Sequence, residues 1–244
     1  MNIVPLVLVK NDCYWLPFAL QSVAGHFERM IIYNVGSTDG TKEIIDWYVD
    51  KEKDTDFIVR HLPDCPPEVQ LTFRNSMIAE ARSPLYLILD GDEIYNKNDL
   101  FRINEIGNIL LNHNEQNNKI KYALFRRVEV SSDLLQRYNN ERTHHRLYHR
   151  DAIWMGTHPG EVPLYEQNSK SELDFTSDIR MLHLHNTLRS PKEEETQSRT
   201  KRKSQRSYHP EGGLVDFNVF EEFPILQQRV ANFPASPCLE ALWA

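Results

Sequence analysis

The N-terminal part of the chain alternates between short apolar runs and longer stretches in which apolar residues recur at helical spacing. The apolar runs, rich in Val, Ile and Leu, are typical of buried strands and span residues 3–9, 29–35, 56–62 and 84–90. The stretches between them are predicted helices, and Asp12 is expected to cap the first and Thr41 or Asp39 the second. This alternation predicts right-handed crossovers and a largely parallel sheet.

Polar residues follow three of these apolar runs. They are Lys10-Asn11-Asp12, Asn34 to Ser37, and Asp90 to Glu93. In a parallel sheet, ligands bind outside the carboxyl ends of the strands, so these polar clusters are expected to meet at one edge. The acids after the fourth run are therefore predicted to line a binding crevice rather than the core.

The pattern becomes less regular after about residue 115. A helix is predicted near residues 98–116, and alternating positions predict strands within residues 119–132, 142–156 and 179–186. The segment 192–206 is charged on nearly every side, which is typical of an exposed helix or arm, with a lid as the alternative. No repeat or linker interrupts the chain, so the change of character is expected within one domain.

Composition excludes several classes of protein. The 244 residues include 35 acidic and 28 basic ones, and a net charge of −7 argues against a nucleic-acid binder. Three scattered cysteines, Cys13, Cys65 and Cys238, predict neither a disulfide framework nor a cysteine zinc site. No apolar run is long enough to span a membrane and no signal peptide is recognisable, so a cytoplasmic protein is expected.

The sequence Asp90-Gly91-Asp92 places two carboxylates around one small residue at the end of a predicted buried strand. Such carboxylates repel each other unless a positive charge balances them, and Mg²⁺ or Mn²⁺ is typically held by one or two carboxylates plus substrate phosphates. The glycine lets backbone and ligand approach closely. A solvated acidic turn is the alternative, because Asp-Gly is a common turn signal.

Four segments in order resemble the family 2 glycosyltransferases, which have the GT-A fold: "LVLVKNDCYWLPFALQSV", "IIYNVGSTDGT", "FRNSMIAEAR" and "LYLILDGDE". The resemblance covers roughly residues 3–95. It implies an α/β, GT-A-like single domain with a mostly parallel central sheet flanked by helices and a more irregular C-terminal half. Residues 1–115 would form the nucleotide-sugar-binding half, and residues 116–244 the acceptor-binding half with a C-terminal extension.

The resemblance also implies roles for the residues that bind the donor. Asp90 would meet the ribose and the metal shell, and Asp92 would hold the metal on the diphosphate. The base would be lined by Val9, Lys10 and Asn11.

Two further positions carry over from the family's motifs. Asn34 stands where the family usually has an acid that contacts the base, and this departure leaves the base preference open because an amide both donates and accepts hydrogen bonds. Arg74 matches an arginine near the nucleotide, with an ordinary surface helix residue as the alternative.

Sugar transfer would need a metal beside the departing diphosphate and a base for the acceptor hydroxyl. The resemblance implies inversion, and it places the base near His158 on the acceptor side, where Glu161 is displaced by two residues from the family's pattern. Glu93 is the alternative base. His183 and His185 alternate on a predicted strand and would supply metal ligands, with a structural role as the alternative.

The resemblance implies a hexosyltransferase-like enzyme that uses Mn²⁺ or Mg²⁺ and a nucleoside-diphosphate sugar, with a UDP-sugar favoured. The acceptor stays open between glycan, lipid and protein, as does peripheral contact with a membrane. Three other hypotheses remain. They are a metal-dependent phosphoesterase built on Asp90, Asp92 and the histidines, a nucleotidyltransferase, which the lack of a glycine in "VKNDCYW" disfavours, and a non-catalytic nucleotide-sugar-binding module.

Overall fold

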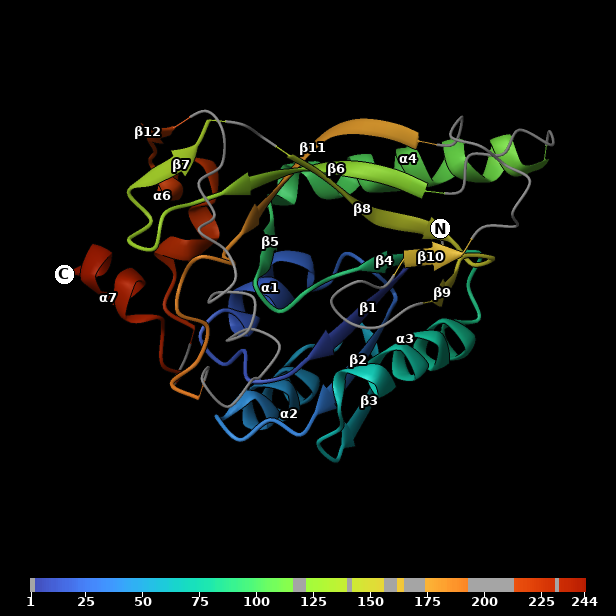
Figure 1. The fold of residues 1–244 in the computed structure, drawn as a ribbon, viewed down its shortest axis with the longest axis horizontal. Coiled ribbons are helices and arrows are strands. Elements are labelled where there is room, and N and C mark those ends of the chain that lie inside the picture. Colours follow the sequence, from blue (N-terminus) through green and yellow to red (C-terminus); the bar gives the residue numbers. More distant parts are fainter. Residues whose placement is uncertain are drawn as a thin grey trace.

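The computed structural model describes residues 3–115, 122–139, 142–155, 162–164, 174–192, 213–230 and 233–244. Figure 1 shows the elements, which are β1 (Ile3–Val9), α1 (Leu16–Val23), β2 (Arg29–Val35), α2 (Thr41–Lys51), β3 (Asp56–Leu62), α3 (Pro67–Ala81), β4 (Leu85–Ile88), β5 (Glu93–Tyr95), α4 (Lys97–Glu115), β6 (Tyr122–Glu129), β7 (Gln136–Tyr138), β8 (Arg142–His149), β9 (Ile153–Met155), β10 (Val162–Leu164), β11 (Asp174–His183), β12 (Leu214–Asp216), α6 (Val219–Glu222), the 3₁₀ helix η2 (Pro224–Gln227) and α7 (Pro237–Trp243).

The N-terminal elements form as their apolar pattern predicts. The four predicted strands are β1 to β4, they pair in parallel in the order β3-β2-β1-β4, and helices α1, α2 and α3 connect them. The first three strands have the predicted bounds, and the fourth ends at Ile88, two residues before the acids. This order, with its reversal between β1 and β4, is the order found around the crevice of doubly wound nucleotide-binding folds.

Strands from the second half extend the same sheet. The full order is β3-β2-β1-β4-β8-β6-β11-β5, with parallel pairing of β11 to β6 and antiparallel pairing of β8 to β4, β6 to β8 and β5 to β11. The predicted segments 119–132 and 179–186 overlap β6 and β11, although β11 ends at His183 and residues 184–186 lie beyond it, and residues 142–156 contain β8 and β9. The α/β fold class, with a mostly parallel central sheet flanked by helices, is confirmed.

The sheet must curl, and the chain length between β4 and β5 requires it. These two strands are four strand spacings apart in the sheet order, which would be about 19 Å if the sheet were flat. The five residue steps from Ile88 to Glu93 reach at most about 18 Å when fully extended. The curl brings the end of β11 next to the segment after β4, where the Leu184 N–H donates to the carbonyl of Asp92 at 2.9 Å.

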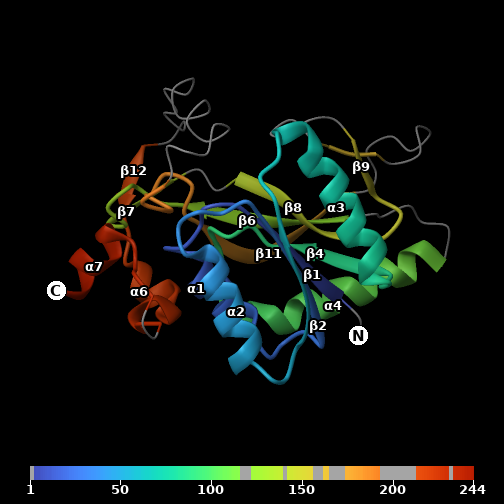
Figure 2. The same cartoon turned by 90° about the horizontal axis from the view of Figure 1, so that it is seen from below.

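Helices cover both faces of the sheet, as the two views together show (Figure 1 and Figure 2). Buried residues of α1, α2 and α4 pack on one face, and α3 packs on the other together with Trp154 of β9. A third cluster joins the C-terminal elements α6, η2 and α7 to Trp15 and Phe18 near the start of α1. This C-terminal segment, for which the sequence predicted no element, therefore buttresses the loop that follows β1.

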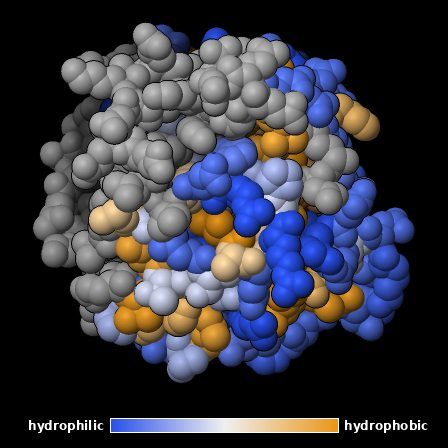
Figure 3. Space-filling view, turned by 90° about the vertical axis from the view of Figure 1, so that its right-hand side faces the viewer, coloured by the Kyte–Doolittle hydropathy of each residue, from blue (hydrophilic) through white to orange (hydrophobic). Residues whose placement is uncertain are grey.

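The described surface carries isolated apolar side chains. Figure 3 shows one face, on which hydrophobic residues lie in separate patches among hydrophilic ones. The exposed large hydrophobic residues belong to different parts of the fold: Val69, Phe101, Leu135, Met155, Leu188 and Leu214. Within the described residues, none of the helices combines the length and the apolar character that a membrane crossing requires.

Gly36 fixes the loop after β2. Its φ of 61° lies in the left-handed region, and its N–H donates to the carbonyl of Leu62 at 2.9 Å. A Cβ at this position would lie 2.5 Å from Cα of Asp64. Gly25 has a similar φ of 69°, but a Cβ there meets nothing within 4 Å. A side chain at Gly25 therefore has only the cost of the left-handed backbone, whereas one at Gly36 also clashes with Asp64.

We expect Gly25→Ala to lower the free energy of unfolding by about 1 kcal/mol, because only the left-handed backbone is penalised. Gly36→Ala is expected to cost roughly 2–5 kcal/mol, since the loop must also move away from the backbone of Asp64. Equilibrium urea denaturation measures both. Equal costs at the two positions would contradict the close approach of the two loops.

Candidate functional site

The loops after β1 and β2 are bound to each other by side-chain hydrogen bonds. The Asn11 N–H donates to Ser37 Oγ at 2.9 Å, and the Thr38 N–H donates to Asn11 Oδ1 at 2.8 Å. Asn11 has a φ of 53°, a left-handed conformation that asparagine tolerates better than most residues. The Asp12 N–H donates to Thr41 Oγ1 at 3.0 Å. The polar clusters after the first two strands are thus held together at one edge of the sheet.

Neither predicted helix cap is the N-cap residue in the structure. The N-cap of α2 is Gly40, without a side-chain cap, and Thr41 is the first residue of the helix, although Asp39 Oδ1 accepts the N–H of Thr41 at 3.0 Å. The prediction that Asp12 caps α1 is wrong, because that helix begins at Leu16 without a side-chain cap. The Asp12 carboxylate is 1% exposed and binds Arg189 instead. A buried carboxylate requires a cation more than a helix end requires an acceptor.

Arg189 and Arg146 neutralise the acids at the ends of β1 and β4. Arg189 contacts Asp12 Oδ1 with Nη2 at 2.6 Å and Nε at 2.7 Å, and its Nη1 lies 2.7 Å from Asp92 Oδ2. Arg146 Nη2 lies 2.9 Å from Asp90 Oδ2 and also contacts Glu93 Oε1. The sequence predicted that a divalent cation would balance these acids. In the folded chain, each of the two aspartates of the Asp-Gly-Asp motif already has an arginine.

These arginines determine the protonation of the aspartates. Burial alone would raise the pKa of Asp90, but the positive charges around it, Arg146 first and then Arg74, together outweigh burial and hold that pKa well below its usual range. Burial likewise opposes ionisation of Asp92, and the charges of Arg189 and then His183 lower its pKa. Burial prevails at Glu93, where it raises the pKa to about 7 against the pull of Arg146. The site therefore holds two ionised aspartates beside a carboxyl group that is close to half-protonated at neutral pH.

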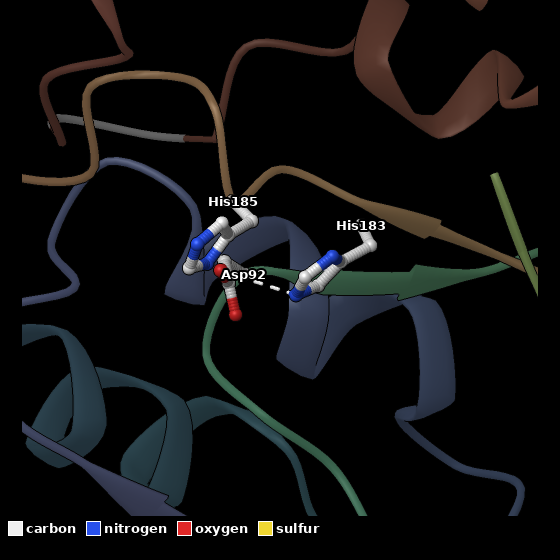
Figure 4. Close-up of side chains that lie close together, drawn as sticks. All are labelled: Asp92, His183 and His185. Atoms are coloured by element: carbon white, nitrogen blue, oxygen red, sulfur yellow. Dashed lines mark ion pairs between the residues drawn. The ribbon is translucent and has the colours of Figure 1, made fainter. Parts of the chain in front are cut away.

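Asp92, His183 and His185 converge on one point at the edge of the sheet (Figure 4). One potential ligand atom from each lies within 4.8 Å of the others, and His183 Nε2 is 3.8 Å from Asp92 Oδ2. The imidazole rings of His183 and His185 stack at 5.3 Å with an interplanar angle of 11°. His183 closes β11 and His185 lies just beyond it, so the predicted alternation still places both rings on the same side.

This set of side chains fits a divalent cation. Among the described residues, no donor makes a well-aligned hydrogen bond to the buried Asp92 Oδ2, although Arg189 Nη1 is close by. Glu129 Oε1 lies 3.4 Å from His183 Nδ1, which leaves Nε2 directed toward Asp92. A carboxylate behind a histidine in this way is typical of metal-binding histidines, because it fixes the ring orientation and the tautomer. One carboxylate oxygen and two imidazole nitrogens suit Mn²⁺ and other transition metals better than a purely oxygen-binding ion.

Gly91 is the middle residue of the Asp-Gly-Asp motif, and its lack of a side chain leaves room for Asp12. A Cβ added to Gly91 would lie 3.0 Å from Cβ, Cγ and Oδ2 of Asp12. Such a contact is tighter than ordinary van der Waals packing, so a larger residue would push Asp12 away from Arg189. The glycine is thus explained by the approach of the β1 loop to the β4 loop.

Other predicted donor-binding residues lie near this edge. Val9 is buried at the end of β1, and Lys10 forms an ion pair with Asp64. Asn34 is 3% exposed, and its Nδ2 lies 3.2 Å from Nδ1 of His61. Arg74 is also buried and lies over the Trp154 ring, with Cζ 4.8 Å from the ring centroid, so the alternative of an ordinary surface helix residue is wrong.

The two candidates for the catalytic base have different outcomes. Glu161 and the acceptor-side residue His158 lie outside the described residues, so their roles stay predictions. Glu93 is fully buried and in contact with Arg146. In this position its carboxyl group is shielded from an acceptor hydroxyl and acts as a partner of the arginine.

Sequence reasoning missed Arg146, Arg189 and Glu129, and it misassigned Asp12. Arg146 lies inside β8 and Glu129 at the end of β6, where single charged residues in an alternating strand resemble an exposed face. Arg189 follows the histidines in an irregular segment. Only the pairing of distant strands reveals that these charges are buried together.

No protein-family model matches the chain, and a search of curated proteins finds no match. Among solved structures, S. aureus TarS 1–349 aligns with a TM-score of 0.43 and 17% identity over 62% of this chain and 47% of its own. The same protein in complex with UDP-GlcNAc aligns with a TM-score of 0.41 and 19% identity over 53% and 35%. The chain thus spans less than half the length of these structures. A likeness at this level assigns neither an activity nor a substrate.

We expect Arg146→Met to lower the free energy of unfolding by roughly 3–5 kcal/mol, because Asp90 and Glu93 would lose their shared buried cation. Glu93→Gln serves as the matched control. It is expected to cost about 1 kcal/mol or less at pH 7, since the carboxyl group it replaces is already close to half-protonated. Urea denaturation of both variants measures the difference. A larger loss for Glu93→Gln than for Arg146→Met would contradict this account of charge compensation.

Proposed function

We propose that this chain is a GT-A-like glycosyltransferase that binds a nucleoside-diphosphate sugar together with a divalent cation and transfers the sugar to a hydroxyl group. The observation that carries the proposal is the position of Asp12, Asp90 and Asp92. These acids follow β1 and β4, the two strands between which the sheet order reverses. The carboxyl ends of the strands at such a reversal border the crevice in which nucleotides bind in open α/β sheets.

The residues that would hold the cation are Asp92, His183 and His185, with Asp90 next to them. When bound there, Mn²⁺ or Mg²⁺ would neutralise the charge that develops on the departing diphosphate. Glu129 keeps His183 oriented toward Asp92, so its contribution is to positioning. This arrangement supports a metal-dependent transfer more than an acidic turn, because the histidines come from a distant strand.

The nucleoside would extend from this point toward the ends of β1 and β2. Asn34 offers an amide group there, since its Oδ1 is buried and makes no hydrogen bond to another described residue. An unpaired buried carbonyl oxygen favours a ligand with an N–H donor. Uracil, thymine and guanine carry a ring N–H, whereas cytosine has an acceptor at the equivalent ring nitrogen, so this observation supports a UDP-, dTDP- or GDP-sugar over a CDP-sugar.

Inversion with a single base is proposed from the resemblance to family 2 enzymes, and Glu161 stays the proposed base. The acceptor would be a glycan, lipid or protein hydroxyl. A metal-dependent phosphoesterase built on Asp92, His183 and His185 is the second candidate, since two histidines and a carboxylate also suit a hydrolytic metal site.

Calorimetric titration of UDP, GDP, CDP and dTDP, each with and without Mn²⁺, tests the proposal. We expect micromolar binding of one or more of these nucleotides that requires Mn²⁺. Asp92→Asn should weaken that binding by at least about tenfold, because it removes the anionic ligand while keeping the shape of the side chain.

Asp178→Asn is the matched control, since Asp178 is exposed and pairs with Arg102 away from the site. It should leave nucleotide binding unchanged. Absence of Mn²⁺-dependent binding for all four nucleotides would overturn the proposal. Release of inorganic phosphate from phosphate esters, independent of any sugar, would instead favour the phosphoesterase.

A further inference from the structure

Arg189 and the proposed cation would share one carboxylate oxygen. Asp92 Oδ2 lies 2.7 Å from Arg189 Nη1 and 3.8 Å from His183 Nε2. An ion held between Asp92 and His183 would therefore lie beside the guanidinium group. Two cations cannot both remain on the same buried oxygen without strong repulsion, because the low dielectric of the interior strengthens the interaction between charges.

The backbone of Arg189 is fixed while its side chain has two anchors. The Tyr14 N–H donates to the Arg189 carbonyl at 3.1 Å, and Trp15 Nε1 donates to the Leu188 carbonyl at 3.0 Å. The guanidinium uses Nε and Nη2 for Asp12 and Nη1 for Asp92. The guanidinium group is planar, so Nη1 leaves Asp92 only if the whole group pivots on the Asp12 carboxylate, which would remain its partner. Such a pivot would direct Nη1 toward the crevice without movement of the main chain.

We propose that Arg189 balances the charge of Asp92 while the site contains no cation. When the divalent cation binds Asp92, Arg189 leaves this carboxylate and binds the diphosphate instead. This inference rests on the proposed function and extends it. Its consequence is coupled binding: Mn²⁺ alone meets the positive charge of Arg189, whereas a diphosphate beside the same site attracts both cations. Each ligand then raises the affinity for the other by the same factor.

The direct test is Mn²⁺ affinity in the absence of nucleotide, measured by electron paramagnetic resonance of the free ion. Arg189→Met should bind Mn²⁺ at least tenfold more tightly than the wild type, because Asp92 loses its competing cation. The same variant should bind UDP at saturating Mn²⁺ at least tenfold more weakly. The factor by which UDP raises Mn²⁺ affinity should therefore fall in the variant.

Arg189→Met leaves the buried Asp12 carboxylate without its cation, which can destabilise the fold. A second variant avoids this problem. Asp12→Asn combined with Arg189→Met removes both partners, leaves the net charge unchanged and frees Asp92 in the same way. It should also gain at least tenfold in Mn²⁺ affinity. Arg29→Met is the control for loss of one positive charge, since Arg29 begins β2 at the opposite end of the strands and pairs with Asp56. Its Mn²⁺ affinity should equal that of the wild type.

The outcomes separate this inference from the proposed function. Mn²⁺-dependent UDP binding in the wild type, with unchanged Mn²⁺ affinity in both Arg189 variants, would overturn the role of Arg189 alone. If no nucleoside diphosphate binds the wild type, the proposed function and the diphosphate contact fail together. The comparison of Mn²⁺ affinities without nucleotide would then still decide whether Arg189 competes for Asp92.

Discussion

The compensation of buried carboxylates by two arginines is the interaction on which the rest of the site depends. Asp12, Asp90 and Asp92 lie where parallel strands end, and the packing removes most of the solvation of Asp12 and Asp92, while the Asp90 side chain stays partly exposed. Ionised carboxylates are stable in such a place only when cations lie against them. Arg146 comes from β8 and Arg189 from the segment after β11. The acids of the N-terminal half are therefore neutralised by the C-terminal half, and neither half completes the site alone.

The curled sheet makes this compensation geometrically feasible. The short segment from β4 to β5 forces the far edge of the sheet back toward its centre, so the end of β11 lies beside Asp92. The same closure supplies the histidines, and Glu129 at the end of β6 orients one of them. A site that already contains its own positive charges differs from a simple acidic pocket. A cation entering it must displace an arginine contact, which links cation binding to the arrival of an anionic ligand.

The sequence predicted the elements whose signal is local. Apolar periodicity located β1 to β4 and the helices between them, and the ends of β1 and β4 pointed to one edge of the sheet. The spacing of His183 and His185 is a local signal too, and it correctly predicted that the two rings lie on the same side. The three-residue β5 and the pairing of β8, β6 and β11 were beyond this approach, because short strands lack a periodic signal and their partners are distant in the chain.

The misassignment of Asp12 has the same physical origin. An aspartate before an apolar helix is a good cap by local rules, and only the tertiary fold shows that Arg189 is near enough to bind it. Arg146 and Glu129 similarly resemble exposed strand residues until their neighbours are known. Charge pairing over long sequence separations is what single-sequence patterns do not contain, and here it forms most of the candidate site.

Anomalous diffraction from crystals grown with Mn²⁺ and UDP would locate both the cation and the diphosphate. We expect one manganese peak within ligand distance of Asp92 and at least one of His183 and His185, with the diphosphate beside it and Arg189 released from Asp92. A manganese peak elsewhere in the molecule, or UDP bound away from these residues while Arg189 still contacts Asp92, would contradict this expectation.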